Sequence, residues 1–200
     1  MGGSAVRAFA RILSAIALIA GVTTGVATAA DKARADEVTI SQDLLRTGWD
    51  QNEPALSPQV LQSGTFGQLF SAAVNGQVYA QPLAIGGNLL VATETNHVYS
   101  LNAETGAVNW QLSLGPSWPE SVIGCGDLQP DIGVTSTPVY DPASGTAYIT
   151  AVVNDGPSLY APNVYLVAIN VQAGTVDWKV PVQGAPVNDP SRPFDPLTER

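Results

Sequence analysis

The sequence is short of the residues on which metal centres and nucleic-acid surfaces depend. Its 200 residues include one cysteine, one histidine and 8 lysines and arginines, against 17 aspartates and glutamates. The formal net charge is −9, and there is no basic cluster that would displace counterions from nucleic acid. The composition therefore excludes a nucleic-acid partner and disfavours anionic membrane surfaces. We interpret the acidity as a source of solubility.

The lone cysteine and the lone histidine offer little for a redox or metal centre. Cys125 has no second cysteine in the chain with which to form a disulfide. In a secreted protein such a thiol pairs with a partner that this chain lacks or is simply buried, and both alternatives stay open. His97 lies in an expected turn, where turn chemistry explains it and no second ligand supports a metal site.

The other motifs that carry chemistry are also missing. There is no glycine loop ending in Lys-Ser or Lys-Thr and no Gly-x-Ser-x-Gly elbow. The loop aspartates lack the regular spacing of a calcium loop, although a weak calcium site in the folded form stays open. These aspartates are Asp127, Asp131, Asp141 and Asp155. We therefore predict no catalytic residues and no dedicated metal site in this chain.

Long hydrophobic runs are missing after the N-terminus. There, Arg7 and Arg11 precede an apolar run over residues 12–26, which ends in small residues. That order is typical of a cleavable signal peptide, so residues 1–30 predict Sec-type export to the periplasm, the cell envelope or the medium. An uncleaved membrane anchor is the alternative, because the run is nearly long enough to span a bilayer. After cleavage we expect no stable membrane span.

What the chain has in abundance is short apolar segments with turns between them. Hydrophobic residues make up 45% of it, alongside 19 glycines and 15 prolines. This mixture predicts many short strands and little helix.

Two segments repeat one another, Val98–Trp110 and Tyr165–Trp178. Each predicts a strand, a tight turn closed by glycine, and a second strand that ends in tryptophan. The repeated positions are Asn102, Gly106, Trp110, Asn170, Gly174 and Trp178. The recurrence of tryptophan just after the turn predicts that Trp110 and Trp178 pack between adjacent repeats.

A further pair of strands is predicted ahead of each hairpin, which gives four strands per repeat. The first pair is Gln81–Ile85 with Leu89–Thr93, and the second is Thr137–Tyr140 with Ala147–Val153. A weaker echo, Gly64–Phe70, lies about one repeat period of 40 to 45 residues before Trp110, and predicts an orphan outer strand.

The stretch Leu101–Trp110 resembles the pyrroloquinoline-quinone-like (PQQ-like, quinoprotein-like) β-propeller repeat of exported bacterial proteins, with its Ala-x-Thr-Gly-x-x-x-Trp pattern. Ile169–Trp178 is similar, with Ala173 in place of threonine. The resemblance extends over residues 46–182. It implies an all-β, partial β-propeller of about two four-stranded antiparallel blades plus one orphan strand, preceded by a signal-peptide helix.

The resemblance also implies two kinds of function, because the family contains both quinone-dependent dehydrogenases and noncatalytic scaffolds. A dehydrogenase of this kind holds PQQ against a disulfide between neighbouring cysteines and uses Glu, Asn and Asp around calcium. Cys125 alone cannot form that disulfide. We therefore expect PQQ and calcium only if the full-length protein is a quinoprotein dehydrogenase, and the cofactor-binding residues stay unknown.

The expected organisation is a signal peptide (1–30), an extended lead-in (31–63), a partial propeller (64–182) and an incomplete Pro-rich tail (183–200). A propeller needs four to eight blades to close, so we interpret the chain as a truncated fragment.

Three functions remain open at this stage. The favoured one is a fragment of a secreted, noncatalytic binding or structural scaffold. The others are a fragment of a PQQ-dependent dehydrogenase whose catalytic residues lie beyond this chain, and a short chain that closes a propeller by self-assembly. A protein or small-molecule ligand is expected on two long inserted loops, residues 115–133 and 154–163.

Overall fold

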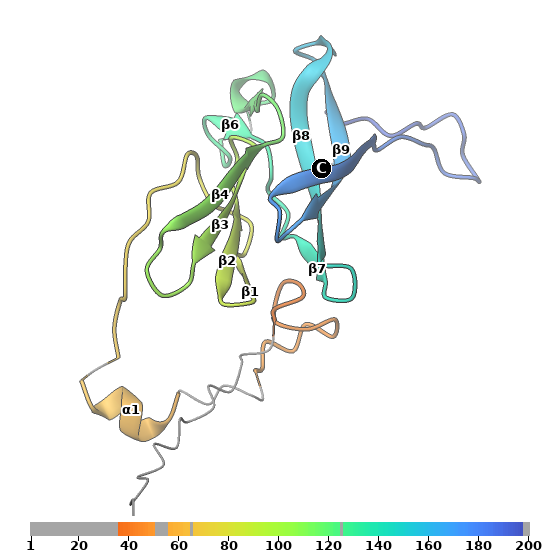
Figure 1. Ribbon diagram of the computed structural model, residues 1–200. Helices are drawn as coiled ribbons and strands as arrows, with labels where there is room; N and C mark the ends of the chain where they lie inside the picture. Colours follow the sequence, from red (N-terminus) through yellow and green to blue (C-terminus); the bar gives the residue numbers. More distant parts are fainter. Residues whose placement is uncertain (1–35, 51–55, 65, 125, 198–200) are drawn as a thin grey trace, which may run out of the picture. The chain divides into compact units, whose positions relative to one another are not determined.

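Two four-stranded antiparallel sheets dominate the structure (Figure 1). The computed structural model describes residues 36–50, 56–64, 66–124 and 126–197, and the predicted signal peptide lies outside them. The first sheet has the order β1-β2-β3-β4, with β1 Leu83–Ile85, β2 Asn88–Ala92, β3 His97–Asn102 and β4 Val108–Ser113. The second has the order β10-β9-β8-β7, with β7 Val139–Asp141, β8 Thr146–Ser158, β9 Ala161–Asn170 and β10 Thr175–Pro181. These sheets confirm the all-β prediction.

Smaller elements lie between and before the two sheets. A two-stranded ladder joins β5 Trp118–Pro119 to β6 Asp131–Ile132, and a 3-10 turn, η1, covers Glu120–Val122. One short helix, α1 Pro58–Gln62, interrupts the lead-in that was predicted to be extended. Its N-cap is Ser57, whose hydroxyl accepts a hydrogen bond from a backbone N–H of the first turn. Within the described residues, no helix is long and apolar enough to cross a membrane.

The repeated asparagine and glycine build the hairpin turns. Asn102 Oδ1 accepts hydrogen bonds from the backbone N–H groups of Glu104 and Thr105, at 3.0 and 2.9 Å. Gly106 follows with a φ of +72°, a left-handed conformation that glycine adopts without steric cost. In the second hairpin Asn170 Oδ1 accepts from Ala173 N–H at 2.9 Å, and the φ of Gly174 is +67°. The same residues therefore make the same turn twice.

The main hydrophobic core lies between the two sheets. Alternate residues of β8 are buried, namely Ala147, Ile149, Ala151 and Val153. They belong to one cluster with residues of the first sheet, including Leu83, Leu90 and Val98. This period-two burial is the pattern expected of a strand with one face on a core.

The other face of the first sheet is covered by the chain just before β1. Val91, Tyr99 and Leu101 form a second buried cluster with Ala72 and Val74 packed against it. The backbone N–H of Asn75 donates to the Tyr99 hydroxyl at 3.0 Å. Residues 72–75 therefore contribute to the core although they form no strand.

The predicted orphan strand over residues 64–70 is wrong. Residues 66–70 are not assigned to a strand, because this glycine-containing segment has no neighbouring strand among the described residues with which to pair. Phe70 nevertheless lies directly against Gly106, where an added Cβ would overlap the Phe70 ring.

The predicted inserted loop over residues 154–163 is also wrong. It is a continuation of β8 and β9, whose ladder extends through Val153↔Asn163 to Ser158↔Ala161 with an irregularity between them. Gly156 lets the Ala161 carbonyl approach closely, where any Cβ would collide with that oxygen. The insert is therefore a long hairpin that rises from the second sheet.

Candidate functional site

Trp110 lies over the turn of the neighbouring sheet. Its indole Nε1 donates to the carbonyl oxygen of Val171 at 3.0 Å. A Cβ added to Gly174 would lie 2.6 Å from Trp110 Cγ, so the indole occupies the space that only glycine leaves open. Phe70 occupies the same place on Gly106. Each hairpin turn thus receives an aromatic ring from the chain that precedes it.

Trp178 holds the position in the second sheet that Trp110 holds in the first. Trp110 is paired with Ser100 across β4 and β3, and Trp178 is paired with Ala168 across β10 and β9. Trp178 is 43% exposed, and its ring lies 5.9 Å from that of Tyr148. With the exposed side chains of Val139 and Val180, these two rings form an apolar surface that we call the Trp178 face.

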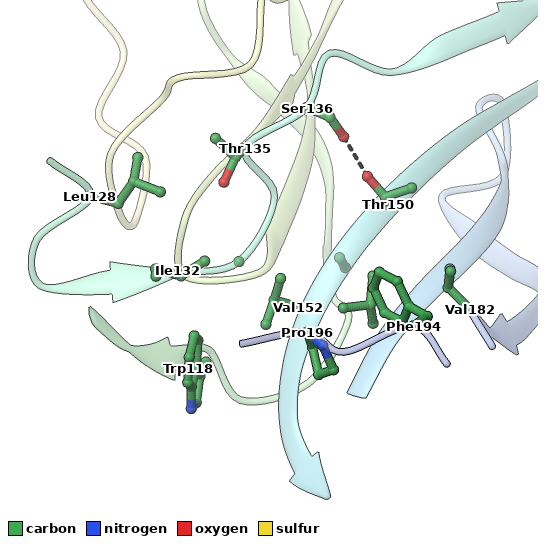
Figure 2. A pocket seen from close by; sticks show the side chains of 13 residues that line it. Trp118, Leu128, Ile132, Thr135, Ser136, Thr150, Val152, Val182, Phe194 and Pro196 are labelled. Atoms are coloured by element: carbon green, nitrogen blue, oxygen red, sulfur yellow. Dashed lines mark hydrogen bonds between the residues drawn. The ribbon is translucent and has the colours of Figure 1, made fainter. Parts of the chain in front are cut away.

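A pocket of about 310 Å³ lies beside β8 (Figure 2). Its walls come from the insert over residues 115–133, from β8 and β9, and from the tail after β10. The apolar side chains that line it are Trp118, Leu128, Ile132, Ala151, Val152, Val164, Val182, Phe194 and Pro196. Residues of the 115–133 insert thus line a pocket, and ligand binding by this insert stays a prediction.

The polar part of the pocket is small. The hydroxyls of Ser136 and Thr150 form a short hydrogen bond with each other (Figure 2). Gly133 and Thr135 also line the pocket, and both are held from behind by Glu94. The pocket therefore presents hydroxyl groups and no charged side chain.

Glu94 is a buried carboxylate that fixes the back wall of the pocket. Its Oε2 accepts from the Gly133 N–H at 2.8 Å and from the Thr135 hydroxyl at 3.1 Å. Burial raises the pKa of Glu94 above the usual glutamate range, the charge of Asp131 adds to the rise, and the two hydrogen bonds oppose it. The Glu94 carboxyl group therefore stays protonated to a higher pH than an exposed glutamate does.

Asn96 ties the same region to the second sheet. Its Nδ2 donates to the carbonyl oxygens of Val152 at 2.7 Å and Pro116 at 3.3 Å. Two buried side-chain oxygens, Glu94 Oε1 and Asn96 Oδ1, have no hydrogen-bond partner within the part of the chain that the structure describes. Such atoms are costly in a protein interior, which agrees with a neutral Glu94.

Three of the four aspartates that were expected in loops lie in strands, Asp131 in β6, Asp141 in β7 and Asp155 in β8. Asp141 accepts hydrogen bonds from Ser144 Oγ at 2.7 Å and from the Ala143 N–H at 3.0 Å, and these bonds lower its pKa. Burial works to raise the pKa of Asp155, but hydrogen bonds from Asn163, from Tyr165 and from Lys179, together with the Lys179 charge, lower it overall.

The described residues around the pocket offer no ligand set for PQQ or calcium, which are expected only of a full-length quinoprotein dehydrogenase. In the described ranges, no three His, Cys, Asp or Glu side chains gather where they would hold a metal ion. PQQ carries several carboxylates, and the pocket offers no cationic side chain to pair with them. Cys125 lies outside the described residues.

The site differs from what the sequence alone suggested. The repeated residues Asn102, Gly106, Trp110, Asn170, Gly174 and Trp178 lie in the two hairpins and make turns and contacts, away from the pocket. Sequence reasoning missed Glu94 and Trp118. A run of polar residues, Thr93–His97, directly after a buried strand was the available signal for Glu94.

Comparison with known proteins finds one matching family model and a similar solved structure. A family model described as outer membrane protein assembly factor BamB matches residues 57–196. A crystal structure of BamB from Moraxella catarrhalis is similar, with 18% identity, a TM-score of 0.37 and a match over 57% of this chain. That match takes in 27% of the Moraxella chain, so this chain spans about a quarter of its length. A search of the curated proteins finds no match.

Proposed function

The chain belongs to the PQQ-repeat family whose model is described as outer membrane protein assembly factor BamB, and on that premise we propose that it is part of an exported, noncatalytic binding scaffold. The proposal has three parts: a further repeat on the Trp178 face, a binding role for the pocket, and export. The Trp178 face is the observation that carries it, because it is the surface through which one repeat joins the next.

The two junctions within the chain define what the Trp178 face requires. Phe70 lies on the turn glycine of the first hairpin and Trp110 on that of the second. Trp178 occupies the equivalent place in its own sheet, yet it is 43% exposed. By the same geometry, a third hairpin with an Asn-x-x-x-Gly turn would cover Trp178, and its backbone carbonyl would accept from the indole N–H.

Burial of an exposed apolar face of this kind against another part of a protein is also energetically favourable. Val139, Tyr148, Trp178 and Val180 lie on adjacent strands and would bury their apolar area against a further sheet. We take that sheet to belong to a longer polypeptide, of which this chain is a fragment. A second copy of the chain is the competing occupant and becomes an outcome of the test.

The pocket supports a binding role over catalysis. Its hydroxyls, Ser136 and Thr150, hydrogen-bond to each other and so are not paired with a general base. The buried carboxyl group of Glu94 accepts hydrogen bonds from the lining residues Gly133 and Thr135 and so holds them in place. A rigid scaffold with an apolar cavity between inserted segments is the usual arrangement of a binding site.

The test compares the chain with a form that continues into whatever coding sequence follows Arg200. Sedimentation velocity over a range of concentrations is measured for the chain, for Trp178→Ser, and for Trp49→Ser as a matched control at another exposed tryptophan. We expect the chain to self-associate through its uncovered face, Trp178→Ser to weaken that association at least ten-fold, and Trp49→Ser to leave it unchanged. The longer form should be monomeric, with Trp178 emission shifted to shorter wavelength.

Two results would count against the proposal. One is a stop codon directly after Arg200 together with a stable oligomer that depends on Trp178, which makes self-assembly the correct alternative. The other is a monomer whose stability and emission are the same with and without the continuation, which would mean that nothing covers the Trp178 face.

A further inference from the structure

The pocket beside β8 has walls that are fixed without any ligand. Trp118 Nε1 donates to the Leu159 carbonyl oxygen at 2.6 Å, which ties the indole to the tip of the long hairpin. The Val152 N–H donates to the Gly133 carbonyl oxygen at 2.9 Å, so the chain over residues 132–136 runs beside β8. Hydrogen bonds of this kind hold the cavity in one shape, and a preformed cavity lowers the entropic cost of binding.

The body of the pocket is apolar and partly aromatic. Figure 2 shows Trp118 from β5 and Phe194 from the tail after β10, with Val152 of β8 between them. The Phe194 N–H donates to the Gly184 carbonyl oxygen at 2.7 Å, which closes the tail into a loop that presents its ring to the pocket. Such a lining takes the apolar body of a ligand out of water.

One polar position breaks this apolar lining. The Ser136 and Thr150 hydroxyls share one hydrogen bond, and each hydroxyl carries one hydrogen. One hydrogen of the pair is therefore left to donate, and lone pairs are left to accept. A single ligand oxygen placed there would complete the hydroxyl network.

The charge of the lining restricts the ligand further. None of the residues that line the pocket is Asp, Glu, Lys, Arg or His, and the net charge of the chain is −9. An anion would find no counter-charge, and a cation would have to lose its water without a carboxylate to replace it. The ligand is therefore uncharged.

We propose that this pocket binds a small uncharged molecule with an aromatic or branched aliphatic body and one hydroxyl or carbonyl oxygen, which hydrogen-bonds to the Ser136–Thr150 pair. The volume of about 310 Å³ is at the lower end for ligand pockets and suits a small molecule. The inference deepens the binding part of the proposed function. It does not require the Trp178 face to be covered.

The experiment uses the 200-residue chain and 4-propylphenol as the probe. Binding is followed by the ¹H–¹⁵N signal of the Trp118 indole, with 4-hydroxybenzoate as a charged probe and propylbenzene as a probe without oxygen. We expect saturable shifts of the Trp118 signal with 4-propylphenol, weaker binding of propylbenzene, and no shift with 4-hydroxybenzoate.

Two variants locate the binding. Thr150→Val removes one hydroxyl at nearly constant shape and should weaken 4-propylphenol binding on the order of five-fold, the usual net effect of one hydrogen bond. Thr175→Val makes the same change at the start of β10, outside the pocket, and should leave the affinity unchanged. Val164→Phe fills the cavity and should abolish binding. If Val164→Phe does not fold, the affinity of Thr150→Val for 4-propylphenol tests the inference by itself.

Three results would overturn the inference. The Trp118 signal stays unmoved by 4-propylphenol at millimolar concentration, Thr150→Val binds as tightly as the parent chain, or 4-hydroxybenzoate binds as well as 4-propylphenol. A form continued beyond Arg200 is measured alongside. Binding by this chain that disappears in the longer form would mean that a further sheet fills the pocket, which also overturns the inference but leaves the proposed scaffold standing.

Discussion

At the scale of single residues, the most consequential side chain is a carboxyl group buried behind the pocket. Glu94 connects the end of the β2–β3 turn to the chain over Gly133–Thr135 through two hydrogen bonds. Only 1% of its surface is exposed. The segment that lines the pocket is therefore held by a group whose charge depends on pH.

The raised pKa of Glu94 predicts a pH-dependent stability. The unfolded chain loses this proton near pH 4.3, whereas the folded chain keeps it to a higher pH. The contribution of Glu94 to the free energy of unfolding is therefore full below pH 4.3 and is lost as the pH rises through the raised pKa. Glu94→Gln keeps the shape and stays neutral, so its stability relative to the parent chain should increase as the pH rises above the unfolded-state pKa of Glu94.

Urea unfolding at a series of pH values measures this effect. Glu104→Gln, at an exposed position in the first hairpin turn, corrects for the loss of one negative charge. A stability difference between Glu94→Gln and the parent chain that stays constant across the whole range would show that the pKa of Glu94 is the same in the folded and the unfolded protein.

At the scale of elements, the sequence predicted the two four-stranded sheets and their hairpins well. It did so because alternating apolar residues and Asn-x-x-x-Gly turns are local signals, and both hairpins form where the pattern placed them. The prediction from the local pattern was wrong where long-range contacts determine the backbone conformation. Gly156 reads as a turn residue, but it lies inside an extended ladder because the opposing Ala161 carbonyl needs its missing Cβ.

The candidate site was less predictable for the same reason. Trp118 and Leu159 are 41 residues apart and meet through one hydrogen bond. Glu94 and Gly133 are 39 residues apart. No local pattern encodes either pairing, so the sequence could indicate the 115–133 insert as a place for ligands without indicating the pocket.

The turns between strands allow a matched test of the junction between the sheets. Gly174 and Gly145 have nearly equal φ values, +67° and +69°, and each closes a turn onto the residue four positions before it. A Cβ at Gly145 meets open space, whereas one at Gly174 meets Trp110. Gly145→Ala should cost about 1–2 kcal/mol for the left-handed backbone, and Gly174→Ala about 1–3 kcal/mol more.

Chemical denaturation of both variants measures the difference. Trp110 emission should shift to longer wavelength in Gly174→Ala alone, since only there is the indole displaced from its place. Equal losses of stability in the two variants would show that the contact of Trp110 with the turn adds nothing to the backbone effect.

At the scale of the whole molecule, the charge balance and the N-terminal segment are the features open to test. The net charge of −9 favours solubility, and the chain has one cysteine. Export is the part of the proposed function that concerns residues 1–30, which lie outside the described structure. It can be tested without reference to the fold.

Expression in a bacterial host with the N-terminus intact should give a shortened chain in the periplasmic fraction. Mass spectrometry of that chain should place the new N-terminus between Ala30 and Asp36. Replacing residues 12–26 partly with polar residues should keep the full-length chain in the cytoplasm. A chain that stays full-length and fractionates with the membrane would indicate an uncleaved anchor.

The direction of the aromatic contacts has a consequence for how such proteins evolve. Each ring, Phe70 or Trp110, reaches forward along the chain to the turn glycine of the following hairpin. Because an aromatic ring meets a turn glycine at both junctions, a repeat copied by tandem gene duplication arrives with an aromatic side chain for its successor and a glycine for its predecessor. Lineages can therefore gain or lose whole repeats, and so change the number of blades in a propeller, without a new kind of contact between repeats.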